Sequence, residues 1–224
     1  MNMKKILIVS CTKGEAKNTL LYKSLSQMKD DVKLIVAANN TKGLPEIYNR
    51  YITSDNLVNH DIVLFVHDDV YIDDLKLKGK LYTAIEDLNY DIVGLAGTRS
   101  LQIKRPYLWH LMSERKDWSG AVTHPVDKDR LLTTTFGPWP MRCAVLDGLF
   151  LAVNLQRALE LGWMFNEKFT FHHYDISSCI DANNKKMKMG TYPIHVTHNS
   201  PGLRDMNDKT FVKSADTFKE LYGN

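Results

Sequence analysis

The feature that most constrains this chain is an abrupt change from apolar to charged residues in its first third. Ile62 to Val66 is a run of five apolar residues with the length and β-branched content of a strand buried on both faces, as in a parallel sheet. His67, Asp68 and Asp69 follow it directly. Because ligands of open α/β sheets bind outside the carboxyl ends of strands, we expect these three residues to lie in a ligand crevice.

These residues suit a divalent cation that is bound together with a nucleotide. Mg²⁺ and Mn²⁺ take carboxylate oxygens and commonly join one or two carboxylates to substrate phosphates. The alternative is that Asp68 and Asp69 are ordinary turn residues. We favour the metal–nucleotide interpretation for residues 67–69, whereas Asp73 or Asp74 is interpreted as the cap of the next helix.

The first half of the chain alternates predicted strands and helices, which favours a parallel sheet with helices on its faces. The expected strands are residues 5–10, 32–37, 62–66 and 91–96, and the expected helices are residues 16–28, 44–52 and 76–88. After residue 153 we expect helices at 155–161, 176–182 and 211–222, and a strand at 187–192.

Residues 98–141 interrupt this alternation. They contain three of the four tryptophans and several prolines and show little periodicity, so we interpret them as a functional or partly ordered insertion. The aromatic rings suit stacking on sugars or bases, and they suit a local core equally well.

Two further carboxylates stand out in the second half of the chain. Asp147 interrupts the apolar, strand-like segment 142–153, and an acid there needs a partner or a ligand because an unpaired buried charge is costly. Asp175 stands where a helix is expected to begin. It is either an N-cap or a catalytic carboxylate presented at the helix start.

Composition and charge restrict the class of protein. The 224 residues have a net charge of +3, so binding to nucleic acid is not expected. The Lys-rich segment 184–188 is interpreted as a solvated face, with at most a weak attraction to an anionic membrane surface. Three widely spaced cysteines without a CxxC motif indicate a reducing compartment. No stretch has the length of a membrane span or the pattern of a signal peptide, so we expect a cytoplasmic protein.

Taken in order, several segments resemble the GT-A fold glycosyltransferases of the family-2 type, especially the small bacterial and viral branch near the StrF-like domains. The segments that carry the resemblance are residues 9–11, 39–50, 62–70, 146–153 and 171–176. The resemblance covers nearly the full chain, and residues 98–141 match poorly.

The resemblance implies an α/β fold of the GT-A type, in which a Rossmann-like mixed sheet has helices on both faces. Residues 1–224 would form a single domain, with a nucleotide-binding half at 1–97. The half at 98–224, which includes the loop-rich insertion 98–141, would hold the donor sugar and the acceptor. The implied donor is a nucleotide sugar, most often a UDP-sugar, bound through Mn²⁺ or Mg²⁺. The implied acceptor is a glycan or another compound with a hydroxyl group.

The resemblance also implies roles for individual residues near the metal and the nucleotide. Asp69 would bind the metal directly, and Asp68 would contact the ribose. His67 occupies the place where many relatives have the first acid of the motif, and we include it among the metal ligands. His198 would be a second protein ligand, with an ordinary loop histidine as the alternative.

Four more residues receive roles in the same way. Asn39 and Asn49 would lie near the uracil and the ribose, and Asp147 would hold hydroxyl groups of the donor sugar or the acceptor. Asp175 would be the base that removes the proton of the attacking hydroxyl, which makes the reaction a single displacement with inversion. The divalent ion would neutralise the charge that develops on the leaving nucleoside diphosphate.

Two other functions stay open on the residues alone. A metal-dependent hydrolase would activate water with a carboxylate–imidazole cage, and such a cage binds its metal without a nucleotide. Its candidate ligands are His67, Asp69, His172, His173 and His198. A non-catalytic module would bind a nucleotide sugar without transfer or hydrolysis. P-loop and dinucleotide-binding functions are excluded, because neither GxxxxGK[ST] nor GxGxxG occurs.

Overall fold

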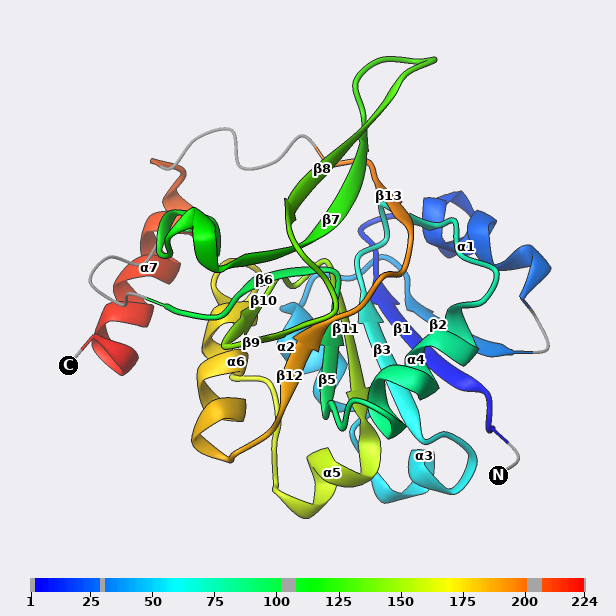
Figure 1. Cartoon of the computed structure of the whole chain (residues 1–224), viewed down its shortest axis with the longest axis horizontal. Coiled ribbons are helices and arrows are strands. Elements are labelled where there is room, and N and C mark those ends of the chain that lie inside the picture. The colour runs from blue at the N-terminus through cyan, green and yellow to red at the C-terminus, as the bar shows by residue number, and fades with distance from the viewer. Residues whose placement is uncertain (1–2, 29–30, 102–107, 201–206, 224) are drawn as a thin grey trace.

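The computed structural model describes residues 3–28, 31–101, 108–200 and 207–223. A seven-stranded sheet forms the centre of the molecule, with helices around it and a second set of strands above it in the view of Figure 1. The central sheet contains, in spatial order, β2 (Val32–Ala37), β1 (Ile6–Cys11), β3 (Ile62–Val66), β11 (Phe150–Asn154), β5 (Ile92–Gly94), β12 (Met189–Thr191) and β9 (Met141–Cys143).

The central sheet is mixed rather than parallel throughout. β1 is parallel to both of its neighbours, β2 and β3. β11 comes from the second half of the chain and pairs antiparallel with both β3 and β5. The mixed sheet implied by the family resemblance is therefore confirmed, whereas the parallel sheet predicted from the first half alone was incomplete.

A six-stranded sheet completes the β structure of the described residues. Its strands are β10 (Val145–Leu146), β6 (Ala96–Thr98), β7 (Trp118–Pro125), β13 (Val196–His198) and β4 (Val70–Ile72), with β8 (Leu131–Gly137) paired to β7. The expected strand at 91–96 is thus divided between the two sheets, as β5 and β6. The strand-like segment 142–153 is divided into β9, β10 and β11.

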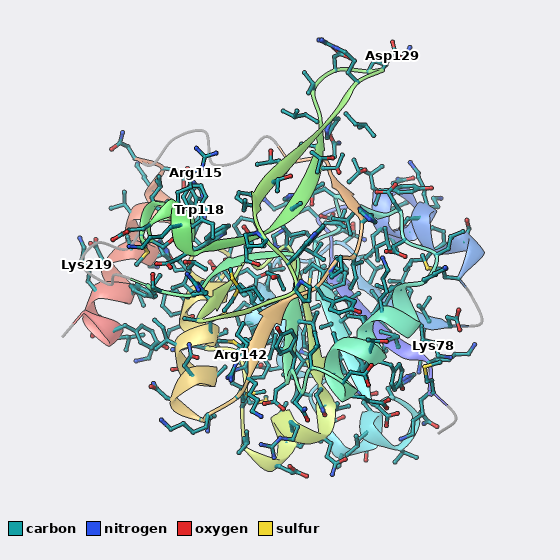
Figure 2. All side chains as sticks on the ribbon, viewed as in Figure 1. Lys78, Arg115, Trp118, Asp129, Arg142 and Lys219 are labelled. Atoms are coloured by element: carbon teal, nitrogen blue, oxygen red, sulfur yellow. The ribbon has the colours of Figure 1, made fainter. Side chains whose placement is uncertain are left out.

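The insertion 98–141 was expected to be loop-rich, and the structure instead contains a long hairpin there. β7 and β8 pair antiparallel and project from the body of the molecule (Figure 1). Asp129 lies at the outer tip of this hairpin, and Trp118 lies close to the body (Figure 2). Most of β8 is exposed, so its sequence lacks the alternation of apolar and polar residues that marks a half-buried strand.

The helices cover the sheets in seven α-helical segments within the described residues. They are α1 (Leu20–Ser24), α2 (Leu44–Asn49), α3 (Ser54–Asn59), α4 (Leu77–Glu86), α5 (Leu155–Glu160), α6 (Tyr174–Asn184) and α7 (Lys209–Tyr222). Short 3₁₀ helices occur at η1 (Ala16–Asn18), η2 (Leu25–Gln27), η3 (Trp109–Leu111) and η4 (Arg115–Asp117). None of the helices within the described ranges has the length and apolar character needed to cross a membrane.

Three details of the helices differ from the sequence predictions. The helix expected at 16–28 is broken, because Thr19 has an extended backbone and its side chain accepts a hydrogen bond from Tyr22 N to start α1. The N-cap of α4 is Lys76, not Asp73 or Asp74. Of the two interpretations of Asp175, the N-cap is wrong: Asp175 is the second residue of α6, and the N-cap is His173, which has a left-handed backbone.

The strand predicted at 62–66 is confirmed as the centre of the core. All five side chains of β3 are at most 1% exposed. Phe65 packs against two aromatic rings, with ring centroids 4.8 Å from Tyr48 and 5.0 Å from Phe165. This packing fixes the position of the strand whose end carries His67 and Asp69.

Replacing Phe65 tests how much this strand contributes to stability. We expect Phe65→Ala to lower the free energy of unfolding by about 3–5 kcal/mol, because it leaves a cavity in a fully buried site. Urea unfolding followed by circular dichroism measures the change. Val58→Ala is the control, since Val58 is 72% exposed and its loss should cost less than about 0.5 kcal/mol. Similar small effects of both substitutions would contradict the central role of β3.

Candidate active site

A pocket of about 370 Å³ opens at the carboxyl end of β3. Its described lining comes from the turn after β3, η3, the hairpin, the turn before β11, the start of α6, the end of β13 and the start of α7. The lining contains three aspartates and six histidines together with several aromatic rings, and none of its described residues is Lys or Arg. The pocket is therefore acidic at one part of its wall and apolar at another.

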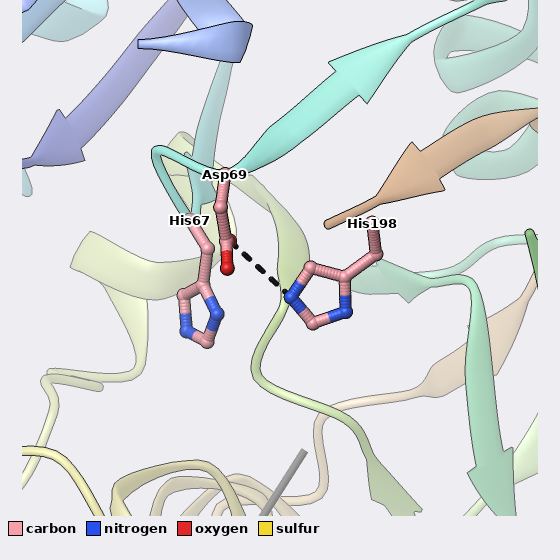
Figure 3. Close-up of side chains that lie close together, drawn as sticks. All are labelled: His67, Asp69 and His198. Carbon is pink, nitrogen blue, oxygen red and sulfur yellow. Dashed lines mark ion pairs between the residues drawn. The ribbon is translucent and has the colours of Figure 1, made fainter. Parts of the chain in front are cut away.

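Three side chains in this pocket converge as a group that can bind a metal ion. His67, Asp69 and His198 each offer a ligand atom, and these atoms lie within 4.8 Å of one another (Figure 3). Antiparallel pairing of β13 with β4 places His198 opposite Val70. The backbone amide of Asn199 also donates to the carbonyl of Asp69, at 3.0 Å. Two distant segments thus meet at the end of β3.

The chemistry of this group fits a divalent cation. Asp69 Oδ1 and His198 Nε2 lie 3.3 Å apart, yet both are buried atoms without an aligned hydrogen bond. Their ion-pair contact lacks hydrogen-bond geometry, and a cation bound between them would coordinate both atoms. Burial opposes ionisation of Asp69, but the imidazoles of His198 and His67 bring its pKa below the ordinary value overall. The carboxylate is therefore charged at neutral pH and available as a ligand.

A pair of aspartates lies in another part of the same pocket. Asp175 Oδ2 accepts a hydrogen bond from the amide of Gly148 at 3.1 Å, and its Oδ1 accepts one from the amide of Ile176 at 2.9 Å. Burial raises the pKa of Asp175 to about 7, and the negative charge of Asp147 contributes to the rise. A carboxyl group with such a pKa exchanges its proton near neutral pH, which a general acid or base requires.

Comparison with known proteins gives the family. A model of a glycosyltransferase-like family matches residues 8–218. The chain belongs to this glycosyltransferase family. No curated protein matches the chain.

Among the solved structures that are similar to this glycosyltransferase, the one with a TM-score of 0.50 supports the GT-A fold. S. aureus TarS residues 1–349 match with a TM-score of 0.50 and 13% identity, over 88% of this chain and 61% of that one. A197 from STIV matches with a TM-score of 0.49 and 12% identity, over 88% and 82% of the two chains. The catalytic domain of Drosophila beta1,4galactosyltransferase 7, in complex with xylobiose, matches with a TM-score of 0.49 and 10% identity, over 84% and 65%.

Asp147 of this glycosyltransferase lies between β10 and β11, not inside a strand as expected. Its Oδ1 accepts a hydrogen bond from the amide of Leu149 at 3.0 Å. Its Oδ2 accepts one from the indole Nε1 of Trp109 at 2.8 Å. The partner that a buried acid needs is thus a tryptophan of the insertion.

Trp109 is a site residue that the sequence analysis did not single out. It is 3% exposed, and its ring lies 5.9 Å from Trp118 and 5.2 Å from Phe136, measured between centroids. Trp109, Trp118 and Phe136 therefore pack together as a local core, one of the two interpretations proposed, whereas Trp139 lies beside His195. The available signal was a tryptophan in a segment with little periodicity, but its contact with Asp147 arises only when η3 packs against the turn before β11.

The residues assigned to the nucleotide lie outside this pocket. Asn39 is in an exposed turn with a φ of 50°. Asn49 is buried, and its side chain donates to the carbonyl and accepts from the amide of Phe165, which ties α2 to that segment. The carbonyl of Asp68 accepts from the amide of Leu21. Contacts of Asn39, Asn49 and Asp68 with a nucleotide stay predictions.

The five-residue cage of the hydrolase alternative is divided in the structure. His172 and His173 line the same pocket but are not among the three ligands that converge. Both pack against Phe211 of α7, and His173 Nδ1 lies 2.9 Å from Ser214 Oγ. Within the described residues, the metal group therefore consists of one carboxylate and two imidazoles.

The charge of Asp147 should set part of the pKa of Asp175. We expect Asp147→Asn to lower the pKa of Asp175 from about 7, while burial keeps it above the ordinary value of an aspartate. A pH titration of the side-chain carboxyl signals by ¹³C NMR measures the change. Asp216→Asn, on an exposed face of α7, is the control. An unchanged titration in Asp147→Asn would show that the two carboxylates do not interact.

Proposed function

We propose that this glycosyltransferase moves a sugar from a nucleotide sugar, with a UDP-sugar as the favoured donor, to a hydroxyl group of an acceptor. The observation that carries the proposal is the arrangement of a metal-binding group and a carboxylate pair along one pocket. Family membership supports glycosyl transfer. The donor, the metal and the stereochemistry are inferred from the residues of the pocket and from the family resemblance.

The proposed metal site consists of His67, Asp69 and His198. Imidazole nitrogens are ligands for transition metals rather than for Mg²⁺, so we favour Mn²⁺ of the two candidate ions. When bound, the ion would neutralise the charge of the diphosphate leaving group. The described lining has no Lys or Arg for that purpose. The three side chains would hold the donor at the end of β3, with its sugar directed toward the carboxylate pair.

The proposed base is Asp175. Its carboxylate is held by the amides of Gly148 and Ile176, so its orientation is fixed before the substrate binds. With a pKa of about 7, it accepts the proton of an acceptor hydroxyl near neutral pH. Asp147, oriented by Trp109, would bind hydroxyl groups of the sugar or the acceptor. Direct attack by the activated hydroxyl inverts the anomeric centre.

Three free and buried cysteines support a further part of the proposal, a reducing and cytoplasmic location. The acceptor would be a glycan, or another compound with a hydroxyl group, that is present in the cytoplasm and enters the pocket.

A ligand screen tests the proposed donor class. Nucleotide sugars are added to the protein with and without Mn²⁺, and the shift of the thermal unfolding midpoint is measured. Compounds that stabilise the protein are then tested for release of the nucleoside diphosphate in the presence of candidate acceptors. Stabilisation that requires Mn²⁺, followed by transfer, is the expected outcome. Release of free sugar without an acceptor would instead indicate hydrolysis.

Removing the carboxylate of the metal group should abolish metal-dependent binding of the nucleotide. We expect Asp69→Ala to weaken the calorimetric affinity for UDP in the presence of Mn²⁺ by at least about tenfold, since one of three ligands is lost. Asp129→Ala, at the tip of the hairpin, is the control and should bind like the wild type. Equal affinity of Asp69→Ala and the control would remove the metal site from the proposal.

Removing the proposed base should separate binding from turnover. We expect Asp175→Asn to reduce the transfer rate by about 10²–10⁴-fold, while UDP-sugar binds with nearly wild-type affinity. The wild-type rate should rise with pH through about 7, because the protonated form of Asp175 cannot accept a proton. Rates at several pH values and calorimetric binding of the donor are the measurements. Normal turnover by Asp175→Asn would refute the assignment of the base.

A further inference from the structure

Tyr174 is a buried residue of the pocket with hydrogen-bonding contacts on two sides. It is the first residue of α6 and is 2% exposed. Its hydroxyl donates to the carbonyl oxygen of Gly148 at 2.6 Å and lies 3.1 Å from His67 Nε2. A carbonyl only accepts hydrogen bonds, and the hydroxyl has a single proton, which Gly148 receives. The oxygen of Tyr174 therefore accepts from His67, and Nε2 carries the hydrogen.

This hydrogen bond determines the chemical state of the other nitrogen of His67. A neutral imidazole has one N–H group, and the contacts of Tyr174 place that group at Nε2. Nδ1 then has a lone pair. Figure 3 shows a ring nitrogen of His67 on the side of Asp69 and His198. Because Nε2 contacts Tyr174, the nitrogen that faces the metal group is Nδ1.

The contact between Tyr174 and Gly148 requires that residue 148 has no side chain. A Cβ atom at this position would lie 2.6 Å from the hydroxyl oxygen of Tyr174 and 2.9 Å from Cβ of Asp175. Both distances are shorter than van der Waals contact allows. Glycine therefore lets the backbone carbonyl approach closely enough to accept a hydrogen bond from the Tyr174 hydroxyl. The hydroxyl oxygen is then left to accept a hydrogen bond from His67.

We propose that Tyr174 is a positioning residue that holds His67 in the Nε2–H tautomer, so that Nδ1 can bind the divalent cation. Without the hydroxyl, His67 can place its hydrogen on Nδ1 and donate it to the carboxylate of Asp69. That hydrogen bond occupies both ligands and opposes binding of the cation. The inference rests on the proposed function for the presence of a cation. The role of Tyr174 involves no direct contact with the metal. Partners that orient metal-binding histidines in this way typically contribute 10–100-fold to affinity.

Two phenylalanine variants test the role of the hydroxyl. Tyr174→Phe removes the partner of His67, whereas Tyr48→Phe removes a hydroxyl that is buried in the same aromatic cluster without a hydrogen-bond partner. Binding of Mn²⁺ is measured by electron paramagnetic resonance of the free ion. We expect about 10–100-fold weaker binding in Tyr174→Phe and wild-type binding in Tyr48→Phe. Equal affinities of the two variants would overturn the inference.

The tautomer itself is measured without metal and without activity. Long-range ¹H–¹⁵N correlation spectra distinguish Nε2–H from Nδ1–H imidazoles, and loss of one signal in His67→Asn assigns the residue. We expect the Nε2–H form in the wild type and in Tyr48→Phe, and a shift toward Nδ1–H in Tyr174→Phe. An Nδ1–H wild type would overturn the inference even if Tyr174→Phe did not fold.

The two proposals fail separately. A wild-type protein that binds Mn²⁺ and has the Nε2–H tautomer, but transfers no sugar, would contradict the proposed function and support the role of Tyr174. Weak Mn²⁺ binding by Tyr174→Phe with an unchanged tautomer would overturn that role alone.

Discussion

The antiparallel pairing of β13 with β4 is the contact on which the candidate metal group depends. It brings His198 beside Asp69, although the two strands are far apart in the sequence. Acidic side chains strengthen this short pairing. Asp73 accepts a hydrogen bond from Thr197 Oγ1 at 2.9 Å, and the buried Asp74 accepts one from the amide of the residue before β13. The acids that the sequence suggests as cap residues therefore hold β13 against β4.

The second half of the chain reaches the same pocket through β11. This strand pairs antiparallel with β3, and the amide of His67 donates to the carbonyl of Leu149 at 3.1 Å. The turn after β3 and the turn before β11 are thereby joined. Because Asp147 belongs to the second turn and Asp175 binds the amide of Gly148, the carboxylate pair lies in the same pocket as the metal group. One sheet thus supports both parts of the site.

Local patterns in the sequence predict the parts of this molecule whose structure is decided locally. The apolar runs of β1 and β3 mark the core strands, and the acids after β3 mark the crevice. The hairpin was missed because most of β8 is exposed and lacks an alternating pattern. His198 has no local signal, and it was a candidate metal ligand only through the family resemblance and as one of five residues of the hydrolase alternative. The bond from Trp109 to Asp147 and the burial of Asn49 arise only when distant segments pack together, so no pattern within either segment predicts them.

The lack of a side chain at Gly148 has a mechanical consequence for the enzyme. Its carbonyl accepts a hydrogen bond from the hydroxyl of Tyr174, and its amide donates one to Asp175. Gly148 is thus in contact through its carbonyl with the tyrosine beside His67, and through its amide with the carboxylate of Asp175. Any displacement of this stretch of backbone moves both neighbours together. The backbone of a single residue would therefore set the distance between the proposed metal ligand His67 and the proposed base Asp175.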